Sequence, residues 1–297
     1  MRPHSSTDSA PKPLYVRISR PLLRLSIRLE AALVDARFTH QQGLQRTNTS
    51  RLLALATLGS RRLRRELHEE RQNLLYERYT RLHTVHYGPQ GRGYSSVSSL
   101  TSEEKMDRYS NQVSRLENFL DKYPDLLQFH DSDSFLDWGC GTGQNIRMLA
   151  QRYPKARIVG YDLNQSALDL ILECERHSLL QLGIGNLADA EFRNAALANG
   201  FDHIIMSHVF SLIFDASLRE TGILREEILT DLVSACRSTL VIVDVFGAPG
   251  PPEIRIEQRH RAIMWEEVLA CFEKFDSGRA FMISNANLRA IVFLKEP

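Results

Sequence analysis

The chain has 297 residues, of which 43% are hydrophobic and 25% charged, a composition typical of a globular protein with a sizeable core. No stretch approaches the roughly 18 uninterrupted apolar residues of a membrane span, and the four cysteines show no CxxC or Cys/His ligand spacing, so we expect no membrane span, disulfide framework or metal site. We expect a cytoplasmic protein with free thiols; the Arg-rich, acid-poor start leaves a mitochondrial transit peptide as the alternative.

The net charge of +1 is the sum of a basic N-terminal part and an acidic remainder. Residues 1–65 carry thirteen Lys or Arg against three acidic residues, a balance of +10, so the other 232 residues carry −9. This asymmetry indicates parts with different roles. We expect residues 1–13 to be a disordered tail, 14–130 a helical N-terminal or cap region, and 131–297 a separate α/β domain.

The helical region begins with an amphipathic pattern. Leucines recur at three- and four-residue steps from Pro21 onward, and a separate stripe of arginines runs beside them, at Arg17, Arg20, Arg24 and Arg28. Such a stripe is usually a solvated face, so we expect the leucines to pack on another helix or to form a homodimer. Nucleic-acid binding is the alternative, and the scarcity of aromatic residues before Tyr76 disfavours it.

Two further helical stretches are predicted before the α/β domain. The first runs from about Thr49 to Leu82 and is followed by a Gly/Ser/Tyr-rich loop at 84–99, which we interpret either as a lid over a ligand or as an exposed linker. The next helix is capped by Thr101 or Ser102 and ends before Pro124. Its predicted apolar face is Met106, Tyr109, Val113, Leu116 and Leu120.

From about residue 131, short apolar runs alternate with helical patterns, which predicts an α/β fold with a parallel sheet. Asn285-Ala286-Asn287 is expected to form a hairpin turn between the last two strands. The expected strands are Ser134–Asp137, Arg157–Tyr161, Ala190–Arg193, Phe201–Ser207, Thr239–Val245, Ala280–Ser284 and Arg289–Leu294.

The first of these strands runs into the glycine-rich stretch FLDWGCGTGQN, residues 135–145. Glycine lets a backbone adopt positive φ or pass close to a ligand, and a strand, a glycine loop and a helix in this order typically cradle a nucleotide. Gly139, Gly141 and Gly143 have GxGxG spacing rather than the dinucleotide GxGxxG. Asp137 would oppose a pyrophosphate but suits an ammonium or sulfonium group. The pattern therefore favours S-adenosylmethionine over NAD.

A second acidic residue supports this interpretation. Asp162 ends the next expected strand, nineteen residues after Gly143. A carboxylate about 20 residues beyond the loop is placed to accept from both ribose hydroxyls. Leu163 beside it is expected to pack on the adenine face.

On the stretches LDWGCGTG, VGYDLN, FDHIIMSHVF and LVIVDVFG, residues 131–297 resemble the class I S-adenosylmethionine-dependent methyltransferases. The resemblance implies a Rossmann-like, seven-stranded mixed sheet of order 3-2-1-4-5-7-6. It also implies that Asp137 and the three glycines hold the methionine end of the cofactor, while Asp162 holds the ribose. We include Cys140, within the loop, in the predicted cofactor site.

One position departs from the family pattern, in which an acidic residue after the third strand binds the adenine amino group. We take AEFRN as that strand, which puts Asn194 in this place, with an amide oxygen that can accept from an amino group. Asp189 is the rival assignment.

The methyl acceptor is expected beyond the carboxyl ends of the first and fourth strands. Ser207, which we add to the cofactor site, and His208 end the fourth strand. A neutral His208 can take a proton from an acceptor hydroxyl or amine; alternatively it only caps the strand, because positioning alone suffices for a good nucleophile. Asp244, ending the fifth strand, either faces the acceptor or caps a loop.

We expect methyl transfer to an oxygen or nitrogen of a small metabolite or sugar, because no signature of base methylation follows the fourth strand. Two alternatives remain open: an RNA- or protein-modifying methyltransferase that uses the basic arm, and a cofactor-binding scaffold protein without turnover.

Overall fold

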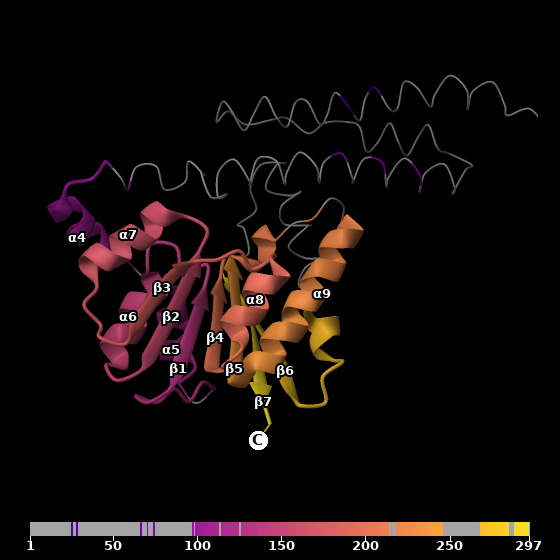
Figure 1. Ribbon diagram of the computed structural model, residues 1–297. Helices are drawn as coiled ribbons and strands as arrows, with labels where there is room; N and C mark the ends of the chain where they lie inside the picture. The colour runs from indigo at the N-terminus through magenta and orange to yellow at the C-terminus, as the bar shows by residue number, and fades with distance from the viewer. Residues whose placement is uncertain are drawn as a thin grey trace, which may run out of the picture. The chain divides into compact units, whose positions relative to one another are not determined.

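The structure is a computed structural model (Figure 1). It describes Leu25, Arg28, Glu66, Glu70 and Leu74, and then residues 97, 99–112, 114–124, 126–213, 215, 218–245, 268–284 and 288–296. The chain divides into two compact units, Met1–Arg78 and Tyr79–Pro297. The five described residues of the first unit are all helical, in agreement with the predicted pattern. The expected tail, dimer contact and most of the 84–99 loop lie outside the described residues, and the domain boundary at residue 130 stays a prediction.

The second unit is built on a seven-stranded sheet of order β3-β2-β1-β4-β5-β7-β6, the predicted order. The first five strands in the chain run parallel, and β7 is antiparallel to both β5 and β6. The strands are β1 Ser134–Trp138, β2 Arg157–Asp162, β3 Leu180–Ile184, β4 Phe201–Ser207, β5 Cys236–Val245, β6 Gly278–Ser284 and β7 Leu288–Lys295. The turn predicted at 285–287 lies outside the described residues, but the antiparallel pairing of β6 and β7 confirms the hairpin.

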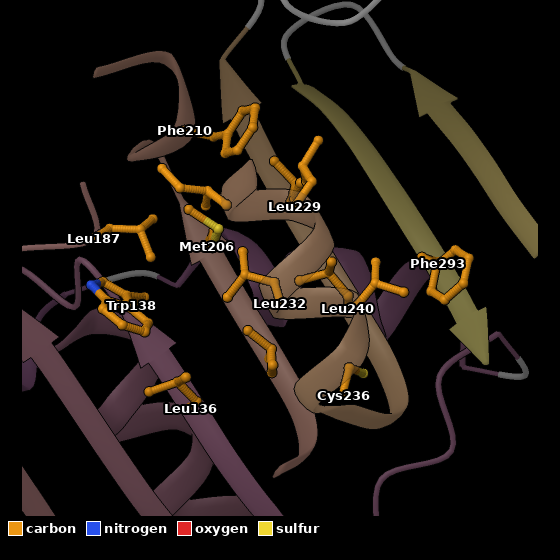
Figure 2. Packing of buried hydrophobic residues seen from close by; sticks show 14 of the residues in the cluster. Leu136, Trp138, Leu187, Met206, Phe210, Leu229, Leu232, Cys236, Leu240 and Phe293 are labelled. Atoms are coloured by element: carbon orange, nitrogen blue, oxygen red, sulfur yellow. The ribbon is translucent and has the colours of Figure 1, made fainter. Parts of the chain in front are cut away.

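Side chains of the central strands alternate between two hydrophobic layers, as the pleat of a strand requires. One face of the sheet packs on α8 (Ala190–Leu197), α9 (Leu218–Ala235) and the helical residues 268–272. Figure 2 shows this layer, in which Trp138 of β1 lies beside Leu187, and Met206 of β4 lies near Leu229 and Leu232 of α9.

The other face of the sheet is covered by the helices that come earlier in the chain. These are α4 (Ser102–Ser110), α5 (Arg115–Lys122), α6 (Gln144–Arg152) and α7 (Gln165–Cys174). Phe135 of β1 and Ile205 of β4 belong to this second cluster together with residues of all four helices. By the same alternation, the side chains of Asp137 and Ser207 point toward this layer. Their hydrogen-bond partners therefore come from its helices.

The predicted helix from Thr101 to Pro124 is in fact two helices, α4 and α5. Thr101 caps α4 with a complete capping box to Glu104, as expected. The chain leaves the helix at Asn111 and starts again at Ser114, whose side chain accepts from the backbone N–H of Glu117. Tyr109, Leu116 and Leu120 are buried as predicted, Met106 is 44% exposed, and Val113 lies outside the described residues.

The prediction of the third strand at Ala190–Arg193 is wrong, because these residues belong to helix α8. Asp189 caps the helix by accepting from the backbone N–H of Phe192 at 3.1 Å. The true strand, β3, lies at the edge of the sheet and pairs only with β2. Its residues are half-buried or exposed, so LQLGI lacks the continuous apolar run that marks a central parallel strand.

Among the described residues, no helix is both long and apolar enough to cross a membrane. Nor do these residues bring together three His, Cys, Asp or Glu side chains in a group suited to a metal ion.

Candidate active site

The loop between β1 and α6 turns through three left-handed glycines. Gly139, Gly141 and Gly143 have φ of +76°, +53° and +89°, values that side chains disfavour. The loop is held against β2 by the backbone N–H groups of Gly139 and Cys140, which both donate to the carbonyl oxygen of Tyr161, at 2.6 and 3.0 Å. The predicted reason for glycine at these positions, positive φ, is confirmed.

The spaces left by the absent Cβ atoms are partly filled by the protein itself. A Cβ on Gly139 would lie 1.9 Å from Cγ2 of Val209, and one on Gly143 would lie 2.9 Å from Tyr109 of α4. The glycine loop is therefore in contact with the residues that follow β4 and with the segment that precedes the sheet. Neither neighbour was identified from the sequence.

Asp137 ends in a buried carboxylate with unused hydrogen-bonding capacity. The residue has no exposed surface; its Oδ1 accepts from Nδ2 of Asn145 at 3.0 Å, while Oδ2 has no hydrogen-bond partner. Burial raises the pKa of Asp137 to about 7, against the effect of the Asn145 bond, and the nearby Asp162 adds to the rise. A buried carboxylate with one unpartnered oxygen is suited to a cationic ligand.

Asp162, at the end of β2, joins the glycine loop to the turn before α7. Its Oδ2 accepts from the backbone N–H of Gly141 at 2.8 Å, and its Oδ1 accepts from that of Asn164 at 2.9 Å. Burial raises the pKa of Asp162 although these bonds act to lower it. Each oxygen retains a further acceptor position for a hydroxyl, so the carboxylate both fixes the loop and can bind a diol.

Two other predicted cofactor residues flank these carboxylates. Cys140 is buried in the hydrophobic cluster under the sheet, and its Sγ lies 3.1 Å from the position of a Cβ on Gly160. Any contact of Cys140 with a cofactor is therefore through its backbone. Leu163 is half-buried directly after Asp162, and its packing on adenine stays a prediction.

The correction of β3 removes the basis for choosing Asn194. Asn194 lies on the exposed surface of α8, and the rival Asp189 is used as the cap of that helix. The residue that follows β3 at the sheet edge is instead Asn186, after Gly185, whose N–H donates to the carbonyl oxygen of Asp162 at 3.0 Å. We propose Asn186 in place of Asn194 for the adenine position; Asn186 is exposed, and its Oδ1 already accepts from the N–H of Ala188 at 3.0 Å. The signal was present in the sequence, since a Gly-Asn pair follows LQLGI directly.

A buried arginine holds the loop that carries Asn186. Arg193 of α8 donates through Nε to Asp231 of α9 at 2.6 Å and through Nη1 to the carbonyl oxygen of Leu187 at 2.7 Å. Its side chain is 3% exposed. The position of the loop after β3 therefore depends on an ion pair between two helices.

Ser207 and His208 lie side by side at the carboxyl end of β4, as predicted. Ser207 Oγ accepts from Nδ2 of Asn145 at 3.1 Å. His208 is half-buried and has a φ of +60°, a conformation that costs a non-glycine residue on the order of 1 kcal/mol and is enriched at functional sites. Its N–H donates to the carbonyl oxygen of Val243 at 2.8 Å, which holds the turn on β5. Asp244 follows on β5, and its side chain lies outside what the structure describes.

These residues fit S-adenosylmethionine. The unpartnered oxygen of Asp137 suits an ammonium group, and the spare acceptor positions of Asp162 suit ribose hydroxyls. Both carboxylates border one glycine loop, which has no side chains at its three turning points. The two carboxylates accept hydrogen bonds, so they match a ligand with an ammonium group and a diol rather than one with a pyrophosphate.

Comparisons with known proteins identify the domain that contains these residues. Residues 136–224, which include the glycine loop, Asp162 and the end of β4, match the model of a family described as a methyltransferase domain. No curated protein matches the chain.

The fold is also found among solved structures. The plantazolicin methyltransferase BpumL in complex with a triazolic desmethylPZN analog and SAH aligns over 77% of this chain and 100% of its own, with a TM-score of 0.51 and 14% identity. The complex with a pentazolic analog gives the same values. A SAM-dependent methyltransferase from Aquifex aeolicus aligns over 66% of this chain and 100% of its own, with a TM-score of 0.45 and 13% identity.

At these identities the structural likeness establishes the fold alone, and the matched family model adds the methyltransferase domain. Together with the strand order and the two carboxylates, they show that this chain contains a methyltransferase domain of Rossmann-like fold, with S-adenosylmethionine as its cofactor.

Proposed function

We propose that this enzyme methylates an oxygen or nitrogen of a small metabolite or sugar. The observation that carries the proposal is the turn after β4, where the half-buried Ser207 and His208 carry a hydroxyl and an imidazole, and Oγ of Ser207 accepts from Asn145, which follows the glycine loop. The contact of Val209 with Gly139 brings this turn next to the loop. A half-buried polar pair of this kind suits a compact acceptor that is enclosed as it reacts.

The protein's own residues have distinct tasks in this reaction. Asp137 binds the ammonium end of the cofactor, Asp162 the ribose and Asn186 the adenine edge. When bound, S-adenosylmethionine would supply an electrophilic methyl group to a lone pair of the acceptor and would leave as S-adenosylhomocysteine, and a hydroxyl or amine acceptor would lose a proton. His208 takes that proton, and Ser207 orients the acceptor.

The test is incubation of the purified protein with methyl-labelled cofactor and a cell extract separated by size. We expect the label in the fraction of small molecules, and we expect His208→Ala to reduce it by about 10²-fold or more if the imidazole acts as a base. Label in RNA or protein would overturn the choice of acceptor, and binding of the cofactor without labelling of any fraction would support a scaffold role.

A further inference from the structure

We propose that Asn145 is a positioning residue of this active site, which holds Asp137 and Ser207 at a set distance and is itself oriented by Ser114. The inference rests on the function proposed above and names two residues, Asn145 and Ser114, to which that function gave no role. It follows from four buried or half-buried side chains that come from β1, β4, α6 and the start of α5.

The side-chain amide of Asn145 uses both of its N–H bonds. Nδ2 donates to Oδ1 of Asp137 at 3.0 Å and to Oγ of Ser207 at 3.1 Å. Asn145 is 5% exposed and lies in the first turn of α6. One amide therefore joins the carboxyl ends of β1 and β4, the two strands between which the acceptor is expected.

The orientation of this amide is not free. Its Oδ1 accepts from Oγ of Ser114 at 2.8 Å, and a hydroxyl must donate in that bond because an amide oxygen has no hydrogen to give. Ser114 is fully buried and also accepts from the N–H of Glu117 as the cap of α5. If the amide were reversed, its NH2 group would face Ser114 and its oxygen would face the Asp137 carboxylate. Ser114 thus keeps the donor side of Asn145 toward the site.

This arrangement has two consequences for the reaction. The bond to Asp137 favours the ionised carboxylate, because it opposes the effect of burial on the pKa. The bond to Ser207 is one in which Ser207 can only accept, so the hydroxyl hydrogen of Ser207 remains directed to another acceptor. The ionised carboxylate receives the ammonium of the cofactor, and the free hydrogen is available to an oxygen lone pair of the acceptor molecule other than the pair that forms the new bond.

Ser114 belongs to the segment that precedes the sheet, and other residues of this segment also contact α6 and the glycine loop. Nη2 of Arg147 donates to the carbonyl oxygen of Gln112, and the ring of Tyr109 lies 2.9 Å from the position that a Cβ on Gly143 would take. The residues from α4 to the start of α5, which Figure 1 shows beside α6 and α7, therefore form one wall of the site. A purely structural role for this wall predicts changes in stability alone; a positioning role predicts changes in cofactor binding and in its pH dependence.

The experiment is calorimetry of S-adenosylhomocysteine binding between pH 6 and 8, which needs no acceptor and no turnover. In the wild type, affinity is expected to rise toward pH 7 as Asp137 ionises; among the described residues, the other titratable groups at this edge include Asp162, Cys140, Tyr109 and His208. In Asn145→Leu, which removes the donor but keeps the volume, we expect binding about tenfold weaker or more at pH 7 and a pH midpoint about one unit higher.

Ser114 supplies a matched test that leaves Asn145 in place. Ser114→Ala should weaken binding several-fold and Ser114→Thr should restore it, because threonine keeps the hydroxyl. Thr101→Ala removes a cap of the same kind from α4, so it controls for loss of helix stability alone and should leave the affinity within about twofold.

The outcomes separate the two proposals. If the wild type does not bind S-adenosylhomocysteine, the function itself fails. If it binds, and folded Asn145→Leu and Ser114→Ala both keep its affinity and pH midpoint, the function stands and the positioning role is overturned. Should Asn145→Leu not fold, the comparison of Ser114→Ala with Thr101→Ala decides between the same two results.

Discussion

The two ends of the central strands hold their polar groups in different ways. At the amino end, Ser134 and Asp202 bind each other reciprocally: Asp202 Oδ2 accepts from the N–H and hydroxyl of Ser134 at 2.8 and 2.7 Å, and the N–H of Asp202 donates to the same hydroxyl at 3.0 Å. Nearby, His203 Nε2 and Asp133 Oδ2 lie 2.8 Å apart, and the ring of His203 is 4.3 and 5.0 Å from those of Phe129 and Phe135.

At the carboxyl end, the buried carboxylate is not fully hydrogen-bonded. Asp137 keeps an oxygen without a partner, and His208 and three glycines hold left-handed conformations. The pKa values differ in the same sense: burial raises that of Asp137 to about 7, whereas at Asp202 the bonds from Ser134 and Arg237 outweigh burial and lower the pKa. The carboxylate of Asp202 at the amino end is fully engaged by protein groups, whereas that of Asp137 at the carboxyl end keeps one oxygen for a ligand.

The largest expected effect is on binding at the carboxyl end. Asp162→Ala removes the proposed ribose acceptor and releases the N–H of Gly141, so we expect cofactor affinity to fall by about 30- to 100-fold, which corresponds to roughly 2–3 kcal/mol. Calorimetry measures the affinity, and circular dichroism checks the fold. Unchanged affinity in a folded variant would mean that the ribose is bound elsewhere.

The amino end should show the converse behaviour. Asp202→Ala leaves the N–H of Ser134 without its acceptor, and we expect the free energy of unfolding to fall by about 1–3 kcal/mol while cofactor affinity changes less than about twofold. Because the folded pKa of Asp202 is lowered, this contribution should be present near pH 7 and lost as the pH falls below about 4. Denaturant unfolding at pH 7 and in a series of steps below pH 4 tests the stability, calorimetry tests the affinity, and a large loss of affinity would contradict the contrast between the two ends.

The pH dependence at the carboxyl end should have the opposite sign. Between pH 4 and pH 7 the folded protein keeps a proton on Asp137 that the unfolded chain has lost, so this group makes the free protein less stable as the pH rises. Asp137→Asn removes the titration, and its free energy of unfolding at pH 8 should exceed that of the wild type by about 1–3 kcal/mol. The difference should shrink toward pH 4, and a difference independent of pH would contradict the argument.

The smallest expected effect on stability is at the left-handed histidine. His208→Gly relieves a backbone conformation that costs on the order of 1 kcal/mol, but the greater freedom of glycine in the unfolded chain offsets much of this gain. We expect the free energy of unfolding to rise by less than about 1 kcal/mol, while turnover falls. His208→Asn is the control, since asparagine tolerates this conformation; full turnover in both variants would leave His208 without a role as the proton acceptor.

The sequence alone was sufficient for the central part of the fold. Strands buried on both faces read as continuous apolar runs, so β1, β2, β4 and β5 were located to within a few residues, and the resemblance supplied their order. The edge strand β3 was misplaced because half-exposed residues leave no such run. The break between α4 and α5 was also missed, although Ser114 and Glu117 have the spacing of a helix start.

In the active site, too, the sequence located some residues and missed others. Asp137, the glycines and Asp162 were identifiable because their chemistry depends on position along the chain: each follows directly on a strand. The roles of Asn145, Ser114 and Val209 were decided only by tertiary structure. Asn145 bonds to residues 31 and 62 positions away, and such contacts arise from packing α5 and α6 on the face toward which Asp137 and Ser207 point. Local patterns record which residues can form a strand, a loop or a cap, but hydrogen bonds between distant elements exist only once those elements are packed.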